Sequence, residues 1–311
     1  MIVTYGAELK DGEFGTTAAA LGSFDALHIG HTQIIGAAVS HAKKNGIRSL
    51  AQLFSYPEEM RVECVNTIEK RIELLDKMGV DIVVVERFDE NFKNMTAVEF
   101  IKSRIIDEYG AKAVFAGFNY RFGKDAAGDT ELLKHECTAH GAAVYVADCV
   151  RFSGDCVSSS RIRAAIKDGD VAAAAEMMNR PYSLCGAVLH GKQIGRTIGF
   201  PTVNMDLPKN LALPAAGVYE TGVRIGGTKY SAITNVGTKP TVHDSSANIE
   251  THIIGFEGNL YGKKIEVEFY EKLREIQSFG SIDGLRAQLE SDIKRVNQKR
   301  KGNENERKLQ G

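Results

Sequence analysis

Short, uniformly apolar segments alternate with helical patterns through the first half of the chain, and this alternation constrains the fold more than any other feature. Residues 81–85 are strongly β-branched and predict a buried strand, whereas apolar residues recur at helical spacing between Thr32 and Asn45. Strands that are apolar throughout must be covered on both faces, so the pattern predicts a doubly wound parallel sheet with helices on both sides, an α/β domain. Further strands are expected over residues 18–22, 49–54, 113–116 and 142–146, and further helices over 68–78, 97–109 and 159–178.

The second half has a different sequence pattern. Residues 179–183 break the helical pattern, and beyond them glycines are frequent and apolar residues alternate with polar ones, most clearly in residues 265–269. Several short strands without intervening helices indicate an all-β unit, an antiparallel β-barrel, and residues 281–297 predict a terminal helix. Because 311 residues exceed what one hydrophobic core usually serves, we expect two domains, residues 1–180 and 181–311.

Charge and cysteine content exclude several classes of protein. The chain has 39 Lys and Arg against 40 Asp and Glu, and a net charge of -1 argues against a general nucleic-acid or membrane-surface binder. No apolar run approaches the ~20 residues that span a bilayer. The odd number of cysteines, without a CxxC pair, argues against a disulfide scaffold or structural zinc site and favours a reducing compartment. We therefore expect a soluble, cytoplasmic protein with no nucleic-acid or membrane partner. The cysteines are Cys64, Cys137, Cys149, Cys156 and Cys185.

The most specific feature of the first half is the segment Gly-Ser-Phe-Asp-Ala-Leu-His-Ile-Gly-His at residues 22–31, which follows a predicted strand and precedes a predicted helix. Its histidines, His28 and His31, are three residues apart at a helix start and can face one ligand. Gly30 allows close backbone approach, and a helix N-terminus attracts phosphate. A βα turn with incidental histidines is the alternative, but the position between strand and helix favours a phosphate-binding role.

Two later segments have similar character. Residues 117–124 follow a predicted strand and interleave aromatic, polar and cationic side chains, and residues 158–163 (Ser-Ser-Ser-Arg-Ile-Arg) open a helix with hydroxyls and cations. A solvated loop and an ordinary helix cap are their plain interpretations. The pattern GxxxxGK[ST] is absent, which excludes a P-loop NTPase. In an open α/β sheet, all three segments lie at the carboxyl ends of strands, where ligands bind.

A glycine-punctuated segment, residues 186–204, marks the second half and ends in Pro-Thr-Val-Asn. Repeated glycines let backbone N–H groups surround phosphates. Thr202 and Asn204 are two apart, so on a strand they point the same way, and their oxygens suit Mg²⁺ that already carries ATP phosphates. Glu250 lies on a later predicted strand, where by itself an exposed structural glutamate is the commoner interpretation.

These segments together resemble those of the bacterial bifunctional riboflavin kinase/FMN adenylyltransferase (FAD synthetase) family, in the same order along nearly the whole chain. The resemblance implies that the second half phosphorylates riboflavin to FMN with Mg²⁺ and ATP, and that the first half transfers AMP from ATP to FMN, giving FAD and pyrophosphate. The chemistry fits the residues. An FMN phosphate is already anionic and needs no base, whereas the alcohol of riboflavin benefits from one.

The resemblance also implies roles for individual residues. Catalytic roles fall to Glu250, as general base of the kinase, and to His28 and His31, as phosphate-binding histidines of the adenylyltransferase. ATP or phosphate binding in the first half falls to Gly22, Phe24, Asp25, Gly30, Asn119, Ser159, Ser160 and Arg163. In the second half, the residues expected to bind ATP or phosphate are Gly191, Gly195, Arg196, Gly199, Pro201 and Thr202. Thr202 and Asn204 are expected to be metal ligands. Phe54 and Arg274 are expected on the flavin side.

The first half of the chain departs from the family pattern at two places. Ala26 stands where the family usually has Gly, and residues 53–58 retain little beyond Phe54 of an expected Thr-Phe-x-Pro-His-Pro-like segment. Two alternatives therefore stay open. One is a riboflavin kinase whose first domain binds nucleotide but adenylates weakly or not at all. The other is a flavin- or nucleotide-binding protein without turnover, although such a protein has no need of a general base.

Overall fold

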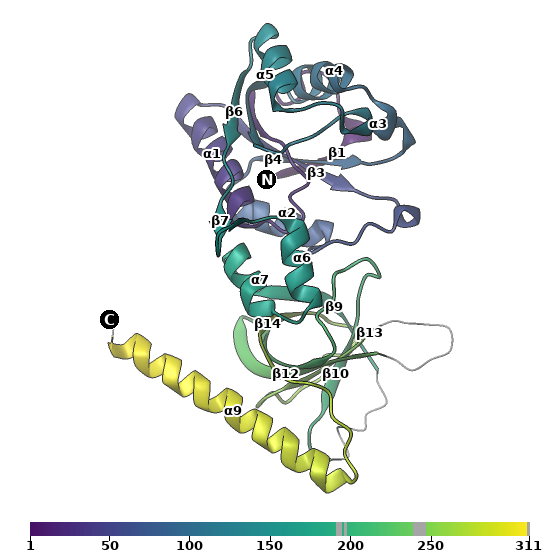
Figure 1. Cartoon of the computed structure of the whole chain (residues 1–311), viewed down its shortest axis with the longest axis vertical. Helices are drawn as coiled ribbons and strands as arrows, with labels where there is room; N and C mark the ends of the chain where they lie inside the picture. Colours follow the sequence, from purple (N-terminus) through teal and green to yellow (C-terminus); the bar gives the residue numbers. More distant parts are fainter. Residues whose placement is uncertain (191–194, 196–197, 239–246, 310–311) are drawn as a thin grey trace. The chain divides into compact units, whose positions relative to one another are not determined.

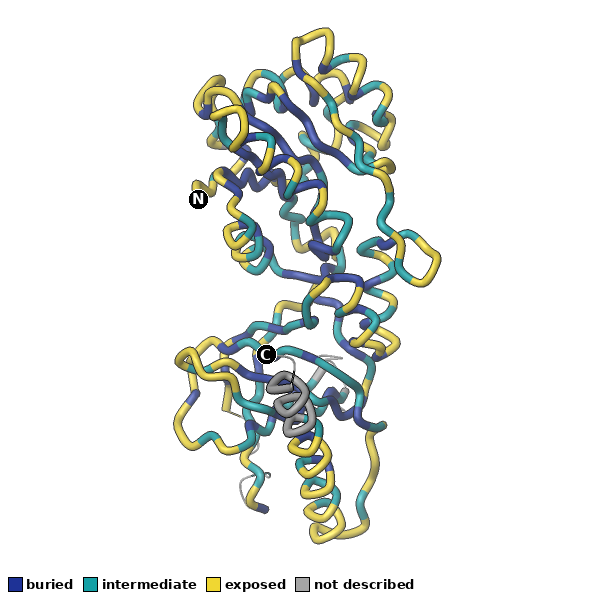
Figure 2. The backbone as a smooth tube through the Cα atoms, turned by 90° about the vertical axis from the view of Figure 1, so that its left-hand side faces the viewer, coloured by how far each residue is buried: buried dark blue, intermediate teal, exposed yellow. Residues whose placement is uncertain are grey.

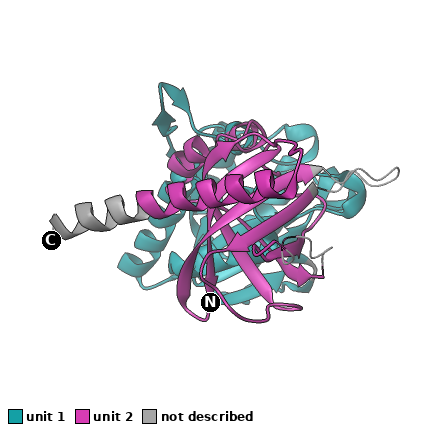
Figure 3. Ribbon diagram, turned by 90° about the horizontal axis from the view of Figure 1, so that it is seen from below, with its two compact units in different colours: residues 1–161 teal, residues 162–311 magenta. Residues whose placement is uncertain are grey.

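A computed structural model describes residues 1–190, 195, 198–238 and 247–309 of the chain (Figure 1). The chain divides into two compact units, residues 1–161 and 162–311, which Figure 3 distinguishes by colour. This division precedes the domain boundary expected at residue 180, because the helix α7 (Val171–Met178) makes contacts with barrel strands of the second unit.

A six-stranded parallel sheet forms the centre of the first unit, in the order β1-β4-β3-β2-β5-β6, with helices on both faces (Figure 1). The predicted doubly wound domain is confirmed. Its strands are β1 (Ile2–Tyr5), β2 (Thr17–Ala20), β3 (Arg48–Ser55), β4 (Ile82–Arg87), β5 (Ala111–Gly117) and β6 (Ala143–Ala147). Its helices are α1 (Ile29–Asn45), α2 (Ile68–Lys77), α3 (Glu90–Asn94), α4 (Ala97–Glu99), the π-helix Phe100–Glu108 and α5 (Thr130–Ala139).

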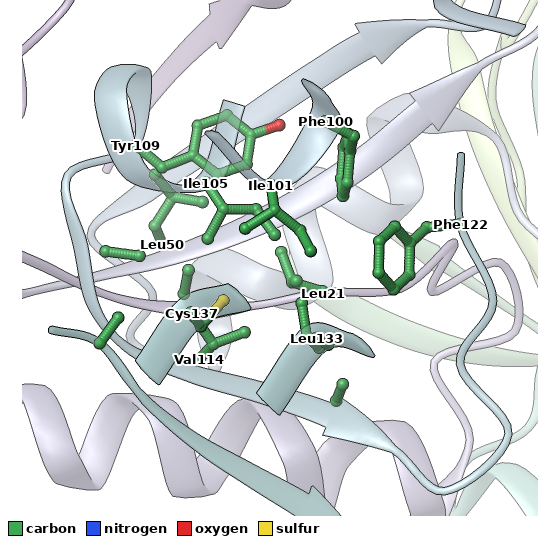
Figure 4. Close-up of a cluster of buried hydrophobic side chains, with 14 of the residues drawn as sticks. Leu21, Leu50, Phe100, Ile101, Ile105, Tyr109, Val114, Phe122, Leu133 and Cys137 are labelled. Carbon is green, nitrogen blue, oxygen red and sulfur yellow. The ribbon is translucent and has the colours of Figure 1, made fainter. Parts of the chain in front are cut away.

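Two hydrophobic clusters, one on each face of the sheet, explain why its strands are apolar throughout. Alternate residues of β2 belong to different clusters: Ala18 and Ala20 pack with α1 and α2, whereas Ala19 packs with the π-helix and α5. Figure 4 shows the second cluster, and Figure 2 shows buried stretches of backbone in the interior of the first unit. Burial on both faces is the arrangement that the uniformly apolar strands require.

Two segments that the apolar periodicity predicted as continuous helices are each divided into two helices. Instead of one α-helix over residues 97–109, α4 is followed by the π-helix. Instead of one helix over residues 159–178, α6 (Ser159–Lys167) ends before Gly169, whose φ is +83°, and Asp170 caps the separate helix α7 by accepting from the Ala173 N–H. The left-handed glycine ends the first helix, and the N-cap starts the second one. The spacing of apolar residues does not reveal either feature.

The second unit is a closed antiparallel barrel in the order β10-β13-β12-β11-β14-β9, as predicted. Ile265, Val267 and Phe269 point inward, and the glutamates between them point outward. The helix α9 (Ile282–Leu309) follows the barrel and continues past the predicted end at residue 297. The barrel strands are β9 (Tyr182–Leu189), β10 (Thr202–Asp206), β11 (Gly217–Ile225), β12 (Thr228–Thr238), β13 (Ala247–Ile253) and β14 (Lys264–Arg274).

A disulfide joins Cys149 and Cys156, one bond in a chain whose cysteine pattern argued against a disulfide scaffold. The short hairpin of β7 (Arg151–Phe152) and β8 (Asp155–Cys156) folds the chain back, so the two Cα atoms lie 5.6 Å apart although seven positions separate the residues. A search for CxxC pairs does not detect a pair that a hairpin brings together.

A thiol count tests this bond. Protein purified without reductant and unfolded in guanidinium should expose three reactive thiols, those of Cys64, Cys137 and Cys185. After reduction the count should rise to five. Cys149→Ser provides the control, because it frees Cys156 and should give four thiols with or without reductant. Five thiols before reduction would show that the bond is absent.

Glu86 is a buried carboxyl in the core of the first unit, and its exposed fraction is 2%. The Tyr109 hydroxyl donates to Glu86 Oε1 at 2.7 Å, and Gln52 Nε2 donates to the Tyr109 oxygen at 2.9 Å. Burial raises the pKa of Glu86 above its ordinary value, although the Tyr109 hydrogen bond and the nearby charge of Arg104 lower it. The folded state therefore binds this proton more tightly than the unfolded state does.

The raised pKa predicts how stability depends on pH. Glu86 contributes stability that is fully present below its unfolded pKa and is lost as pH rises through its folded pKa. Glu86→Gln keeps an oxygen that can accept from Tyr109 but cannot ionise. The free energy of unfolding of the wild type, minus that of Glu86→Gln, should therefore fall as pH rises from about 4. Urea unfolding of both proteins from pH 4 to pH 8 measures this difference in free energy. A difference that stays constant or rises with pH would contradict the expectation.

Candidate functional sites in the two units

The first unit contains a cavity of about 680 Å³ at the carboxyl ends of its central strands. The sheet order explains its position. From β2 the chain moves through β3 and β4 toward one edge, and β5 and β6 then extend the sheet on the other side of β2. Ligands in open α/β sheets bind at such a switch point, where loops from adjacent strands diverge.

The predicted phosphate loop, residues 22–31, lines this cavity in a strained conformation. Phe24 and Leu27 both have a φ of +46°, in the left-handed region that costs about 1–2 kcal/mol for a residue with a side chain. A Cβ on Gly22 would lie 2.9 Å from the Phe24 ring, so only glycine allows this ring to fold back. Ala26 is fully buried without a positive φ, so the departure from the family's Gly is tolerated here.

His28 is the N-cap of α1, because its Nδ1 accepts a hydrogen bond from the His31 backbone N–H at 3.2 Å. An accepting Nδ1 carries no proton, so in the neutral ring Nε2 is protonated and is a donor. The His28 and His31 rings stack with centroids 3.6 Å apart, and the Phe24 ring meets His31 edge-on at 5.1 Å. Both imidazoles line the cavity, so capping and stacking fix them toward a ligand there.

The cavity brings together most of the residues that sequence reasoning assigned to the first half. Asp25 and Arg163 are not among its lining residues. The Asp25 carboxylate instead accepts from the Val65 and Asn66 backbone N–H groups at 2.8 and 3.4 Å and so fastens the loop to the segment before α2. The predicted residues that do line the cavity are Gly22, Phe24, His28, Gly30, His31, Phe54, Asn119, Ser159 and Ser160.

Sequence reasoning missed an aromatic wall around Phe54, which we define as Phe54, Tyr56, Phe88 and Phe92. Their ring centroids lie 5.5–6.5 Å apart in the contacting pairs, and all four line the cavity. Phe88 directly follows β4, so the rule that sites lie at carboxyl ends of strands could have found it. Lys93 and Arg121 also line the cavity and give it two cations.

The second unit brings Thr202, Asn204 and Glu250 onto one outward face of the barrel. Asn204 on β10 is the direct register partner of Glu250 on β13, and Thr202 is that of His252. Directly opposite Cβ atoms lie about 4.5–5.5 Å apart. Residues 249, 251 and 253 point into the core, so Glu250 between them faces outward and is half-buried. Asn235 on β12 pairs with Glu250 from the other side, a neighbour that sequence reasoning missed.

Hydrogen bonds hold the side chains and the loop near this face. Asn248 Nδ2 donates to Glu250 Oε1 at 2.7 Å, and the Pro201 carbonyl lies 2.9 Å from His252 Nδ1. A Cβ on Gly195 would lie 2.3 Å from the Phe200 carbonyl oxygen, so a glycine is required there. Gly199 has a φ of +87°. The predicted ATP-binding residues Gly191 and Arg196 lie outside the described residues.

Arg274, expected on the flavin side, has a partner within its own unit. Its guanidinium donates to the Asp292 carboxylate of α9, with Nη2 2.9 Å from Oδ2, and to the Glu275 carbonyl. Both charged side chains are largely buried: 15% of the Arg274 side chain and 6% of the Asp292 side chain is exposed. The pair therefore fastens α9 to the barrel.

Two classes of feature are absent from the described part of the chain. No cluster of three or more His, Cys, Asp and Glu side chains could hold a metal ion there. Within the same residues, no helix combines the length and the apolar character needed to cross a membrane.

Comparisons with known proteins agree with this two-unit organisation. The family model for FAD synthetase matches residues 11–161, and that for riboflavin kinase matches residues 178–299. A curated bifunctional riboflavin kinase/FMN adenylyltransferase from Pseudomonas fluorescens is 32% identical over 282 residues, covering 88% of this chain and 90% of its own. Its counterpart from Bacillus subtilis is 31% identical over 301 residues, covering 93% and 94%.

One solved structure, described as a macrolide-efflux protein from Streptococcus pneumoniae, superposes with a TM-score of 0.86 at 30% identity and covers 96% of this chain and 99% of that one. The fold thus extends over both units. Matches to both family models, together with relatives that align over nine-tenths of their length, lead to one conclusion: the chain belongs to the bifunctional riboflavin kinase/FMN adenylyltransferase family.

Proposed function

We propose that this chain converts riboflavin to FAD in two ATP-dependent steps, each at its own site. The barrel face with Thr202, Asn204 and Glu250 phosphorylates riboflavin to FMN, and the cavity with His28 and His31 adenylates FMN. The observation that supports this most is that the two sets of polar side chains lie in different compact units of one chain. The named relatives combine both activities in one protein.

In the adenylyl step, an oxygen of the FMN phosphate attacks the α-phosphorus of ATP, and the bond to the departing pyrophosphate breaks. The nucleophile is already anionic, so the site has to stabilise negative charge rather than remove a proton. The Nε2–H of His28 and the N-terminus of α1 are donors for the phosphates. The aromatic wall offers apolar ring faces to the flavin, and Phe54 and Phe88 each contact the other three rings.

In the kinase step, the terminal ribityl hydroxyl of riboflavin attacks the γ-phosphorus of ATP, and ADP leaves. Glu250 takes the hydroxyl proton, and its bond from Asn248 keeps the carboxylate oriented. The Thr202 hydroxyl and the Asn204 amide oxygen are hard donors on one strand face, which fits Mg²⁺. When bound, the ion neutralises charge on the ATP phosphates.

The same proposal covers organisation and partners. Residues 1–180 would act as the adenylyltransferase domain and residues 181–311 as the kinase domain, with ATP, riboflavin and FMN as substrates. We propose a cytoplasmic location, where these substrates are available, and no nucleic-acid or membrane partner.

One incubation tests the proposal against both alternatives. Purified protein with riboflavin, ATP and Mg²⁺ is sampled over time, and the flavins are separated by chromatography. FMN should appear first and FAD after it. FMN without FAD would support a kinase with an inactive first domain, and unchanged riboflavin would support a binding protein without turnover.

A further inference from the structure

Arg71 of α2 is a buried cation beside the phosphate loop, and its charge has no counter-ion among the residues that the structure describes. Its exposed fraction is 2%. Its Nη1 donates to the Ser23 carbonyl at 3.1 Å, and its Nε has no hydrogen-bond partner. Among the ion pairs of the described residues, none includes Arg71. Burial of an unpaired charge is costly, so a stabilising residue alone does not explain this arginine.

The bond to Ser23 acts on a peptide group whose two residues both line the cavity. The Ser23–Phe24 peptide is trans, so its C=O and N–H point in opposite directions. With the carbonyl directed at Arg71, the Phe24 N–H points away from the guanidinium. Both Ser23 and Phe24 line the cavity. Phe24 is fully buried, and its N–H has no acceptor among the described residues. A buried N–H without a protein acceptor requires water or a ligand.

We propose that Arg71 is a positioning residue for adenylyl transfer, which fixes and polarises the Ser23–Phe24 peptide so that the Phe24 N–H donates to a nucleotide phosphate. A donor bound to the carbonyl of a peptide strengthens the N–H of the same peptide, more so at low dielectric. The fixed carbonyl also holds Phe24 in its left-handed conformation. The inference rests on the proposed assignment of adenylyl transfer to this cavity.

Substitution of Arg71 tests the inference, and the kinase activity of the same chain is an internal reference. Arg71→Gln should lower kcat for FAD formation from supplied FMN by about 10- to 100-fold, with KM for ATP within about threefold, because the donor matters most as charge develops. FMN formation from riboflavin should stay within about twofold. Arg71→Lys keeps the charge and should recover FAD formation to within about fivefold of wild type.

Arg48→Gln is the matched control. Arg48 also donates from its guanidinium to a backbone carbonyl, that of Phe14, but it begins β3 at the end of the strand remote from the cavity. Arg48→Gln should leave the rates of FMN formation and of FAD formation unchanged. Rates are normalised to the folded fraction from thermal unfolding. If Arg71→Gln keeps more than half of the wild-type FAD formation, or if Arg71→Lys is no better than Arg71→Gln, the inference is wrong.

Two further measurements remove the remaining ambiguities. In wild-type protein labelled with ¹⁵N-phenylalanine, ATP should move the Phe24 amide proton downfield, and its failure to move would overturn the inference even if Arg71→Gln does not fold. His28→Asn is assayed in parallel. If His28→Asn loses FAD formation and Arg71→Gln does not, only the role of Arg71 is wrong. If neither loses it, and His28→Ala does not lose it either, the assignment of the cavity itself is wrong.

Discussion

Glu250→Gln should lower the rate of FMN formation from riboflavin by about 10²- to 10⁴-fold, the range that general-base catalysis contributes. The substitution is nearly isosteric, and its remaining oxygen can still accept the Asn248 hydrogen bond, so the change removes basicity and little else. Conversion of supplied FMN to FAD should be unaffected, because the cavity of the first unit contains no residue of β13. Initial rates with each flavin as substrate, separated by chromatography, measure both activities.

Glu257→Gln is the control for this experiment, since it makes the same substitution at an exposed glutamate just after β13. It should leave both activities at the wild-type level. Equal loss of both activities in Glu250→Gln would contradict separate sites. A rate of FMN formation within about threefold of wild type would remove Glu250 as the base.

The sequence predicted the strands of the first unit well because their apolar character has one physical cause, burial on both faces. The strand expected at residues 81–85 is β4 (Ile82–Arg87), and that expected at 113–116 is β5 (Ala111–Gly117). The three loops that the motifs singled out also line one cavity. Carboxyl ends of parallel strands share an edge, and this explains why residues 22–31 and 117–124, which follow β2 and β5, come together. Residues 158–163 instead follow the β7–β8 hairpin.

The features that were missed depend on contacts between distant segments. The aromatic wall combines rings at or just after the ends of β3 and β4 with one from α3, and no local pattern around Phe54 indicates that the other three rings pack together with it. Arg71 looks like any exposed helical cation, since the sequence does not reveal that its side chain is enclosed beneath the phosphate loop. The Cys149–Cys156 bond likewise depends on a hairpin too short to show strand periodicity.

His28→Ala and His28→Asn should each lower FAD formation from FMN by about 10²- to 10³-fold, the loss that follows removal of a donor to developing charge. The two variants differ in their effect on the fold. Asparagine is a good N-cap and can replace His28 Nδ1 as acceptor for the His31 N–H, whereas alanine leaves that N–H without its cap. Only His28→Ala should therefore lose stability, by about 1 kcal/mol.

Comparison of the pair separates the chemical role of the imidazole from its role in starting α1. FAD formation is assayed with supplied FMN, stability is measured by urea unfolding, and kinase activity in the same samples reports on the second unit. If His28→Asn were as active as wild type and His28→Ala were not, His28 would matter only as a helix cap. The phosphates would then have to be bound by His31, the free N–H groups of α1 and the hydroxyls of Ser159 and Ser160.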